Sequence, residues 1–188
     1  GRFNMWSAIR MAHKLEPFDP FFYEEPIPPD NIDAMAEVQR SINLPVATGE
    51  RLYTRWEFRP LLEKQAARII QPDICHAGGI LELKKIAAMA EVYFVAVSPH
   101  NFNSTTLGLA ATIQASATMP NFLITEYFIN LEEFGNAICE KPLQVEKGYI
   151  ELPESPGLGI DINEAALPFY PYKQFPLRPL RQFYEEGP

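Results

Sequence analysis

The stretch "IIQPDICHAGGI", residues 69–80, joins a short apolar run to a polar turn and then to a helix-like segment. The apolar run has the length of a buried strand, and polar residues follow it at once. Further runs share this form, at residues 20–26, 44–50, 94–101 and 121–128. Segments with helical spacing separate them, so that a strand returns every ~25 residues, as repeated β–α units require. The sequence therefore predicts an α/β fold with about five parallel strands.

The helices expected between these strands differ in how clearly the sequence marks them. Residues 79–94 give the clearest helix, because apolar residues recur on one stripe. Residues 55–66 contain Pro60, so we expect that helix to begin late or to be kinked. The remaining expected helices are a leading one at 5–15, one at 31–42 capped by Asp30 or Asn31, and one at 105–119.

The pattern changes from about Asn130 onward. Residues 143–163 predict short extended pieces joined by turns, and residues 167–188 are rich in Pro and aromatic side chains. We therefore divide the chain into residues 1–130 and an irregular carboxyl-terminal extension, residues 131–188, which is expected to lie over a surface. Aromatic residues of this tail suggest an interface, and we expect a homo-oligomer on this ground; they are Phe169, Tyr170, Tyr172 and Phe175.

The composition argues against several classes of function. The net charge of −8 disfavours nucleic acid or an anionic membrane as the main partner. Cys75 and Cys139 are too few for a disulfide framework, so we expect a reducing, cytoplasmic location. No apolar run reaches the ~18 residues that a membrane span needs. The chain opens with "GRFNMWSAIR", without an initiator Met or a secretory signal, and we expect it to derive from a longer protein.

Polar residues gather at the carboxyl ends of the expected strands; they are Glu24, Glu25, Glu50, Asp73, His100 and Glu126. In a parallel sheet or barrel these ends share one side, where ligands bind. Carboxylates that converge without Lys or Arg raise one another's pKa, and a divalent cation relieves this repulsion. Oxygen ligands favour Mg²⁺ over zinc. Glu25 is less suited as a ligand than Glu24, because neighbours in a strand point to opposite sides.

Simpler interpretations remain open for each of these residues. Asp73 and His100 could form an orienting acid and a base, since a carboxylate on one ring nitrogen raises the basicity of the other, but Asp73 could also merely cap the next helix. A Glu at a strand end is most often a solvated loop residue. Cys75 is expected to be a small buried filler rather than a nucleophile. His76 is expected to be a structural hydrogen-bonding residue. The shared register of the successive units favours one common site.

Several segments, in order along the chain, carry a family resemblance; they are "YEEPIPPDN", "LPVATGE", "IIQPDICHAGGI", "SPHN" and "LITEYF". Together they resemble the barrel domain of the enolase superfamily, in its mandelate racemase-like branch, over about residues 1–165. The separations of 26 residues between Glu24 and Glu50, and of 27 between Asp73 and His100, are similar to those of the family's metal ligands and His–Asp pair. A branch that uses a lysine base is disfavoured, because "QPDICHAGG" holds no Lys. "PDICHAGGI" and "SPHN" look closest to acid-sugar dehydratases of the galactonate type.

This resemblance implies a partial (β/α)8-type TIM barrel and a role for each site residue. Glu24 and Glu50 would bind Mg²⁺. His100, oriented by Asp73, would be the general acid and base on one face of the substrate. Glu126 would hydrogen-bond the substrate carboxylate as it becomes an enediolate.

The reaction that the resemblance implies is the Mg²⁺-dependent dehydration of a sugar acid, an aldonate, to a 2-keto-3-deoxy acid. A racemase or epimerase of a 2-hydroxy acid on the same scaffold, and a non-catalytic remnant of the barrel, are the alternatives. The family's third metal ligand, a second His and a capping domain would fall before Gly1. We therefore expect the 188-residue chain alone to be inactive. Residues 131–188 would pack on the barrel or on that capping domain.

Overall fold

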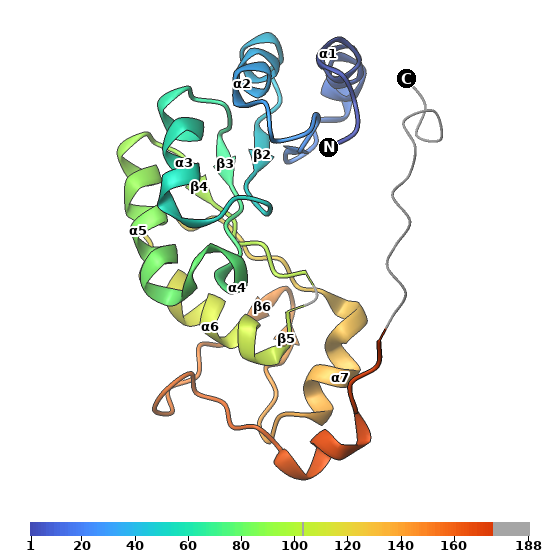
Figure 1. The fold of residues 1–188 in the computed structure, drawn as a ribbon, viewed down its shortest axis with the longest axis vertical. Helices are drawn as coiled ribbons and strands as arrows, with labels where there is room; N and C mark the ends of the chain where they lie inside the picture. Colours follow the sequence, from blue (N-terminus) through green and yellow to red (C-terminus); the bar gives the residue numbers. More distant parts are fainter. Residues whose placement is uncertain (103, 175–188) are drawn as a thin grey trace.

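Strands and helices alternate along the chain as the sequence predicts (Figure 1). A computed structural model describes residues 1–102 and 104–174. The strands are β1 (Tyr23–Glu24), β2 (Val46–Thr48), β3 (Ile69–Ile70), β4 (Ala96–Val97), β5 (Val145–Glu146) and β6 (Tyr149–Ile150). The α-helices are α1 (Met5–Leu15), α2 (Ile32–Ser41), α3 (Thr54–Glu63), α4 (Ile74–Ala77), α5 (Gly79–Val92), α6 (Thr106–Ser116) and α7 (Glu132–Ala137). The 3-10 helices are η1 (Glu16–Phe18), η2 (Ile129–Leu131) and η3 (Glu164–Phe169).

The central sheet is parallel, with the strand order β1-β2-β3-β4. A parallel bridge between Val97 and Phe122 adds the segment after α6 to the edge of β4, and the Leu123 amide donates to the Val97 carbonyl at 2.8 Å. The fifth predicted strand is therefore a single bridge rather than a full strand. The parallel α/β architecture of a partial barrel is confirmed.

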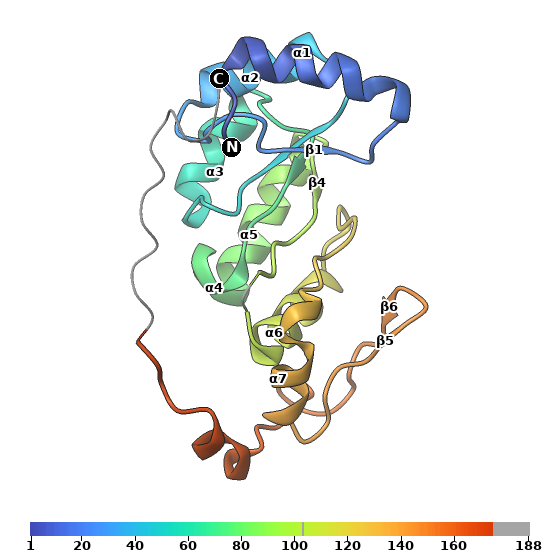
Figure 2. The same cartoon turned by 90° about the vertical axis from the view of Figure 1, so that its right-hand side faces the viewer.

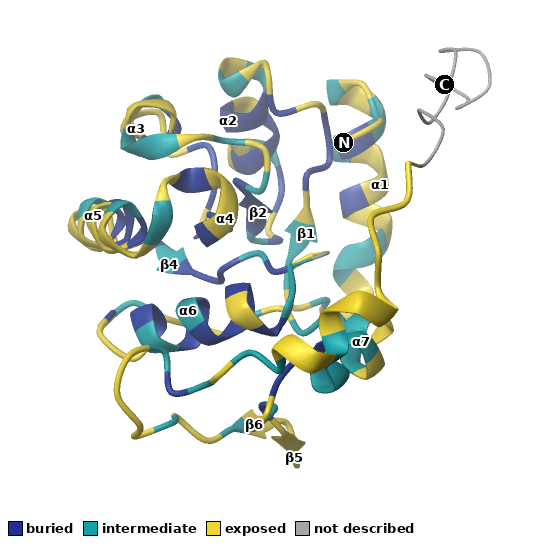
Figure 3. Ribbon diagram, turned by 60° about the horizontal axis from the view of Figure 1, so that its bottom comes forward, coloured by how far each residue is buried: buried dark blue, intermediate teal, exposed yellow. Residues whose placement is uncertain are grey.

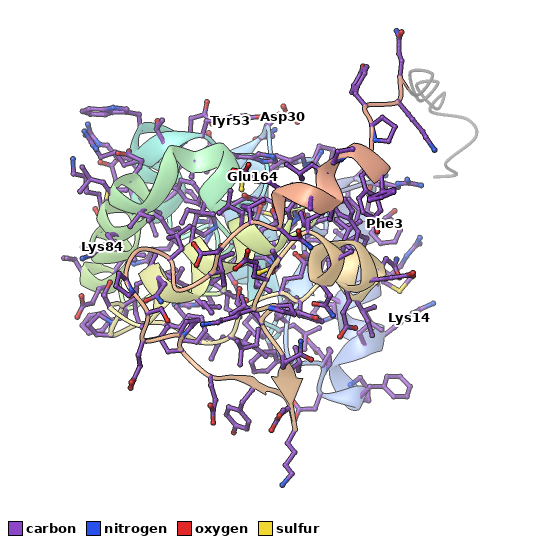
Figure 4. All side chains as sticks on the ribbon, turned by 90° about the horizontal axis from the view of Figure 1, so that it is seen from below. Phe3, Lys14, Asp30, Tyr53, Lys84 and Glu164 are labelled. Carbon is purple, nitrogen blue, oxygen red and sulfur yellow. The ribbon has the colours of Figure 1, made fainter. Side chains whose placement is uncertain are left out.

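The helices form an arc around the strands, as Figure 3 shows. Successive helices contact one another, α1 with α2, α2 with α3, α3 with α5 and α5 with α6. Figure 4, seen from below, places Lys84 of α5 and Lys14 of α1 at opposite sides of the molecule. Val46, Ile70 and Val97 belong to the main apolar core, which also contains residues of the helices. Alternate strand residues point away from the helices, toward the inner face of the sheet.

Local signals account for most helix boundaries. α1 spans the predicted residues, and α2 begins after Asn31, whose Oδ1 accepts a hydrogen bond from the Ala34 amide at 3.0 Å. The late start expected for the helix around Pro60 is wrong, because α3 already begins at Thr54. The buried side chains of this helix, Phe58, Leu61 and Leu62, lie on both sides of the proline, so tertiary packing outweighs the one hydrogen bond that a proline lacks.

The carboxyl-terminal part lies on the α6 side, away from α1 (Figure 2). β5 and β6 form an antiparallel hairpin, which confirms the prediction of short extended pieces joined by a turn. Residues of this region pack against Leu109, Ala110 and Ile113 of α6; they are Leu143, Ile150, Leu158 and Ile160. The division of the chain at residue 130 stays a prediction, and Phe175 lies outside the described residues. None of the described helices has the length and apolar character needed to cross a membrane.

Candidate active site

Asp73 and His100 meet where β3 and β4 end. The two residues form a parallel bridge, and His100 Nδ1 lies 2.7 Å from Asp73 Oδ2. Oδ1 of Asp73 accepts a hydrogen bond from the Cys75 amide at 2.7 Å and so caps α4. The one carboxylate therefore caps a helix and also contacts the imidazole, and its role in orienting a base stays a prediction. The side chain of Asp73 is 1% exposed, and the contact with His100 is buried with it.

Two further carboxylates face the other nitrogen of the same imidazole. His100 Nε2 lies 3.4 Å from Glu50 Oε2 and 3.6 Å from Glu126 Oε2. The Asn101 amide donates to Glu126 Oε2 at 2.9 Å and fixes that side chain beside the ring. Burial favours a neutral ring, but the Asp73 hydrogen bond and the charges of Glu126 and Glu50 outweigh it and raise the pKa of His100. The strand ends that the sequence predicts to converge thus do so around one imidazole.

Glu24 and Glu50 share an electrostatic environment at this mouth. Burial, together with the negative charges of Glu25 and Glu24, raises the pKa of the Glu50 carboxyl, and His100 opposes the change. Glu24 accepts a hydrogen bond on Oε1 from Gln71 Nε2 at 2.5 Å. A carboxyl whose ionised form is disfavoured by like charges is stabilised by a bound cation.

The donor set agrees in kind with Mg²⁺ and would supply two protein ligands, Glu24 and Glu50. Carboxylate oxygens are the ligands that Mg²⁺ prefers, and one or two of them commonly suffice beside water and substrate oxygens. The residues that the structure describes contain no group of three His, Cys, Asp or Glu side chains arranged to hold a metal ion. Glu24 and Glu50 would therefore hold the ion together with ligands from elsewhere.

Sequence reasoning missed an ion pair next to these ligands. Glu25 is 5% exposed and has a φ of 35°, so its side chain is buried and its backbone is in the left-handed region. Arg51 Nε donates to Glu25 Oε2 at 3.0 Å, and Thr48 Oγ1 donates to Oε1 at 3.2 Å. Glu25 is thus occupied by protein partners. The available signal was the Arg that directly follows Glu50 in the sequence.

Cys75 and His76 lie in the turn after β3, and only His76 has the place that the sequence predicts. Cys75 is exposed, so its expected place as a buried filler is wrong; its Sγ lies beside Gly108 of α6, 3.0 Å from where a Cβ on that glycine would stand. Desolvation and the charge of Asp73 raise the pKa of this thiol, although a hydrogen bond with Ser104 opposes them, and the reactive thiolate is disfavoured. His76 Nδ1 lies 3.3 Å from the Glu50 carbonyl oxygen, which fits the predicted structural hydrogen bond.

Comparisons with known proteins find relatives of this chain in sequence and in fold. The family model described as "Enolase C-terminal domain-like" matches residues 1–166. The D-xylonate dehydratase of Haloferax volcanii is 38% identical over 161 residues, which are 86% of this chain and 39% of that protein. The D-galactonate dehydratase of Ralstonia pickettii is 37% identical over 171 residues, which are 88% of this chain and 44% of that protein.

Solved structures show the same fold. The mandelate racemase/muconate lactonizing enzyme-like protein from Roseovarius sp. TM1035 superposes with a TM-score of 0.88 at 46% identity. The match covers 93% of this chain and 43% of that one. The chain thus spans less than half the length of these relatives.

Proposed function

Since the chain belongs to the enolase C-terminal domain-like family, we propose that it forms part of a magnesium-dependent dehydratase that removes water from a sugar acid. One observation carries the proposal: a single imidazole, His100, lies between the buried Asp73 carboxylate and the carboxylates of Glu50 and Glu126. The names of the relatives agree, since they include dehydratases of xylonate, galactonate and gluconate.

The proposed first step is removal of the proton next to the substrate carboxylate. Asp73 accepts a hydrogen bond from the Nδ1–H group of the neutral His100 ring, so that Nε2 is free to take a proton. The short contact also holds the ring in one orientation, which a base needs if it is to meet the substrate at a fixed distance. His100 is therefore the proposed base, and Asp73 is the residue that orients it.

The proton beside a carboxylate is very weakly acidic, so the imidazole needs electrostatic help. Mg²⁺ held by Glu24 and Glu50 would supply it by stabilising the negative charge that develops on the substrate carboxylate. Glu126, when it carries a proton, would donate a hydrogen bond to that carboxylate. Loss of the 3-hydroxyl as water, with a proton from an acid, then gives an enol that becomes the 2-keto-3-deoxy acid.

An assay of the whole protein against a panel of aldonic acids tests this proposal. We expect Mg²⁺-dependent formation of a 2-keto-3-deoxy acid, lost on removal of the metal and in Glu50→Gln. Exchange of the α-proton with solvent deuterium, without keto-acid formation, would instead identify a racemase or epimerase. Mg²⁺ binding that is unchanged in Glu50→Gln would contradict the metal site and favour a non-catalytic role.

A homo-oligomer and a cytoplasmic location stay predictions. Phe169 and Tyr172 are 81% and 88% exposed, so both are available to a partner, whereas Tyr170 packs edge-on against Phe134 with ring centroids 4.9 Å apart. Size-exclusion chromatography with light scattering on the wild type and on Phe169→Ser/Tyr172→Ser checks the interface. We expect the variant to dissociate to a smaller species.

A further inference from the structure

Gln71 is a buried polar residue for which the proposed reaction has no role. It directly follows β3, and it is 6% exposed. It lines a cavity of about 240 Å³ together with Glu24, His100 and Glu126. A polar side chain buried beside a proposed metal ligand needs a physical explanation.

Gln71 reaches across an entire strand to its partner. The register pairs Glu24 with Ala47 and Ala47 with Ile69, so these side chains share the inner face of the sheet. Gln71 lies two residues after Ile69 and returns to that face. On the intervening strand, Ala47 carries only a methyl group on this face. The path from Gln71 to Glu24 is therefore open, and the hydrogen bond of 2.5 Å crosses β2.

The contact fixes which way the amide of Gln71 points. Nε2 donates to the Glu24 carboxylate, and the reverse orientation would set two acceptors against each other. Oε1 is then left buried without a hydrogen-bond partner among the described residues. A buried acceptor without a partner destabilises a fold. The side chain is thus placed for its single donor contact and not for the stability of the sheet.

We infer that Gln71 is a positioning residue that holds the Glu24 carboxylate in place for the divalent cation, and this inference rests on the proposed function. The hydrogen bond occupies Oε1 of Glu24 and leaves Oε2 for the ion. The amide is neutral, so it orients the carboxylate without cancelling its charge, as a lysine at this position would. A partner of this kind raises metal affinity by holding the ligand in the binding orientation.

The test measures Mn²⁺ affinity in the whole protein by electron paramagnetic resonance, with Mg²⁺ as competitor, and metal-free thermal stability in the same samples. Gln71→Met keeps the volume and removes both the donor and the unpartnered acceptor. We expect the Mn²⁺ dissociation constant to rise about 10–100-fold. We also expect the metal-free melting temperature to stay the same or to rise. A purely structural glutamine would show the opposite, with lower stability and unchanged affinity.

A second buried glutamine supplies the matched control. Gln39 is 7% exposed, its Nε2 donates to the Leu44 carbonyl at 3.3 Å, and its Oε1 accepts from the Val46 amide at 2.8 Å. Both ends of this amide are satisfied, so Gln39→Met should lower the melting temperature and leave Mn²⁺ affinity unchanged.

Gln71→Asn keeps the amide on a shorter stem and replaces the first variant if Gln71→Met does not fold. It too should weaken Mn²⁺ binding, since the donor no longer reaches Glu24. Wild-type affinity in a folded Gln71 variant overturns the inference and leaves the proposed function standing. Absence of Mn²⁺ binding in the wild type overturns both.

Discussion

Glu25 and Arg51, which directly follow the proposed ligands Glu24 and Glu50, form an ion pair with each other. The pair ties the end of β1 to the end of β2. Glu25 is buried and Arg51 is half exposed, so the guanidinium compensates the charge of a carboxylate that water hardly reaches. The pair therefore adds a side-chain link to the backbone hydrogen bonds that already join the two strand ends.

Arg51→Met should destabilise the metal-free protein by about 1–3 kcal/mol, because it leaves a buried charged acceptor without its donor. Urea unfolding measures the change. Adding Glu25→Gln to this variant should recover part of the loss, since the uncompensated charge is then gone. The exposed pair of Arg59 and Glu63 on α3 is the control, and Arg59→Met should change the stability far less than Arg51→Met does. Equal losses in Arg51→Met and Arg59→Met would contradict the role given to the buried pair.

Gly49→Ala should disturb both the fold and the metal site. Gly49 has a φ of 139°, and an added Cβ would lie 2.9 Å from the backbone nitrogen of Gln71 and 2.9 Å from Phe58 Cε1. The backbone strain alone costs about 1–3 kcal/mol, and the clash adds to it. Mn²⁺ affinity should fall as well, because the clash displaces the backbone of Gln71.

Gly148→Ala separates these two effects. Gly148 also has a positive φ, 84°, but nothing lies within 4 Å of an added Cβ. This variant should show strain without a clash and leave Mn²⁺ affinity as it is. Urea unfolding and Mn²⁺ titration of both variants decide the point, and equal effects in the two would contradict the clash at Gly49.

The elements that the sequence predicted well are those with local signals. α1 and α2 have the predicted bounds within a residue, because helical periodicity and the Asn31 cap depend only on residues that are close together in the sequence. The meeting of Asp73 and His100 followed from a general property of parallel strands, whose carboxyl ends lie on one side.

The features that the sequence did not predict depend on contacts between distant segments. Phe122 pairs with Val97 in a single bridge, so the predicted fifth strand does not form in full although its composition suits a strand. The exposure of Cys75 depends on how α4 packs against α6, where Sγ lies beside Gly108. Gln71 did leave a signal, since a glutamine two residues after Ile69 in an apolar run shares a face of the sheet with it.

Asp73→Asn should slow the proposed reaction by about 10²–10⁴-fold, the usual contribution of general acid–base catalysis. An asparagine oxygen can still accept from the Cys75 amide and cap α4, so the turn should keep its shape. The neutral amide no longer raises the basicity of His100 or fixes its proton on Nδ1. Steady-state kinetics on the whole protein should show the loss in kcat with KM nearly unchanged. A loss confined to KM would instead place Asp73 in substrate binding.

The stability that Asp73 and His100 contribute should depend on pH in a defined window. The raised pKa of His100 means that its contribution is complete below the unfolded value of 6.5 and is lost as the pH rises through the folded value above it. Burial of Asp73 opposes ionisation, but the hydrogen bonds from His100 and the Cys75 amide lower its pKa below 3.8. Its contribution is therefore complete above 3.8 and lost as the pH falls through the lower folded value.

The metal-free wild type should consequently melt at a higher temperature than His100→Gln. The difference should be largest between about pH 4 and pH 6.5, the interval between the ordinary pKa values of Asp and His. The difference should narrow as the pH rises through the raised pKa of His100, above which the ring is neutral and keeps only its hydrogen bond. Metal must be removed, because Glu50 and Glu126 face the same ring and a bound cation would compete with its charge. His13 on α1 is half exposed beside Glu16, so His13→Gln is the control and should change the melting temperature little. A difference for His100→Gln that grew with pH would mean that the ring is held neutral in the folded protein.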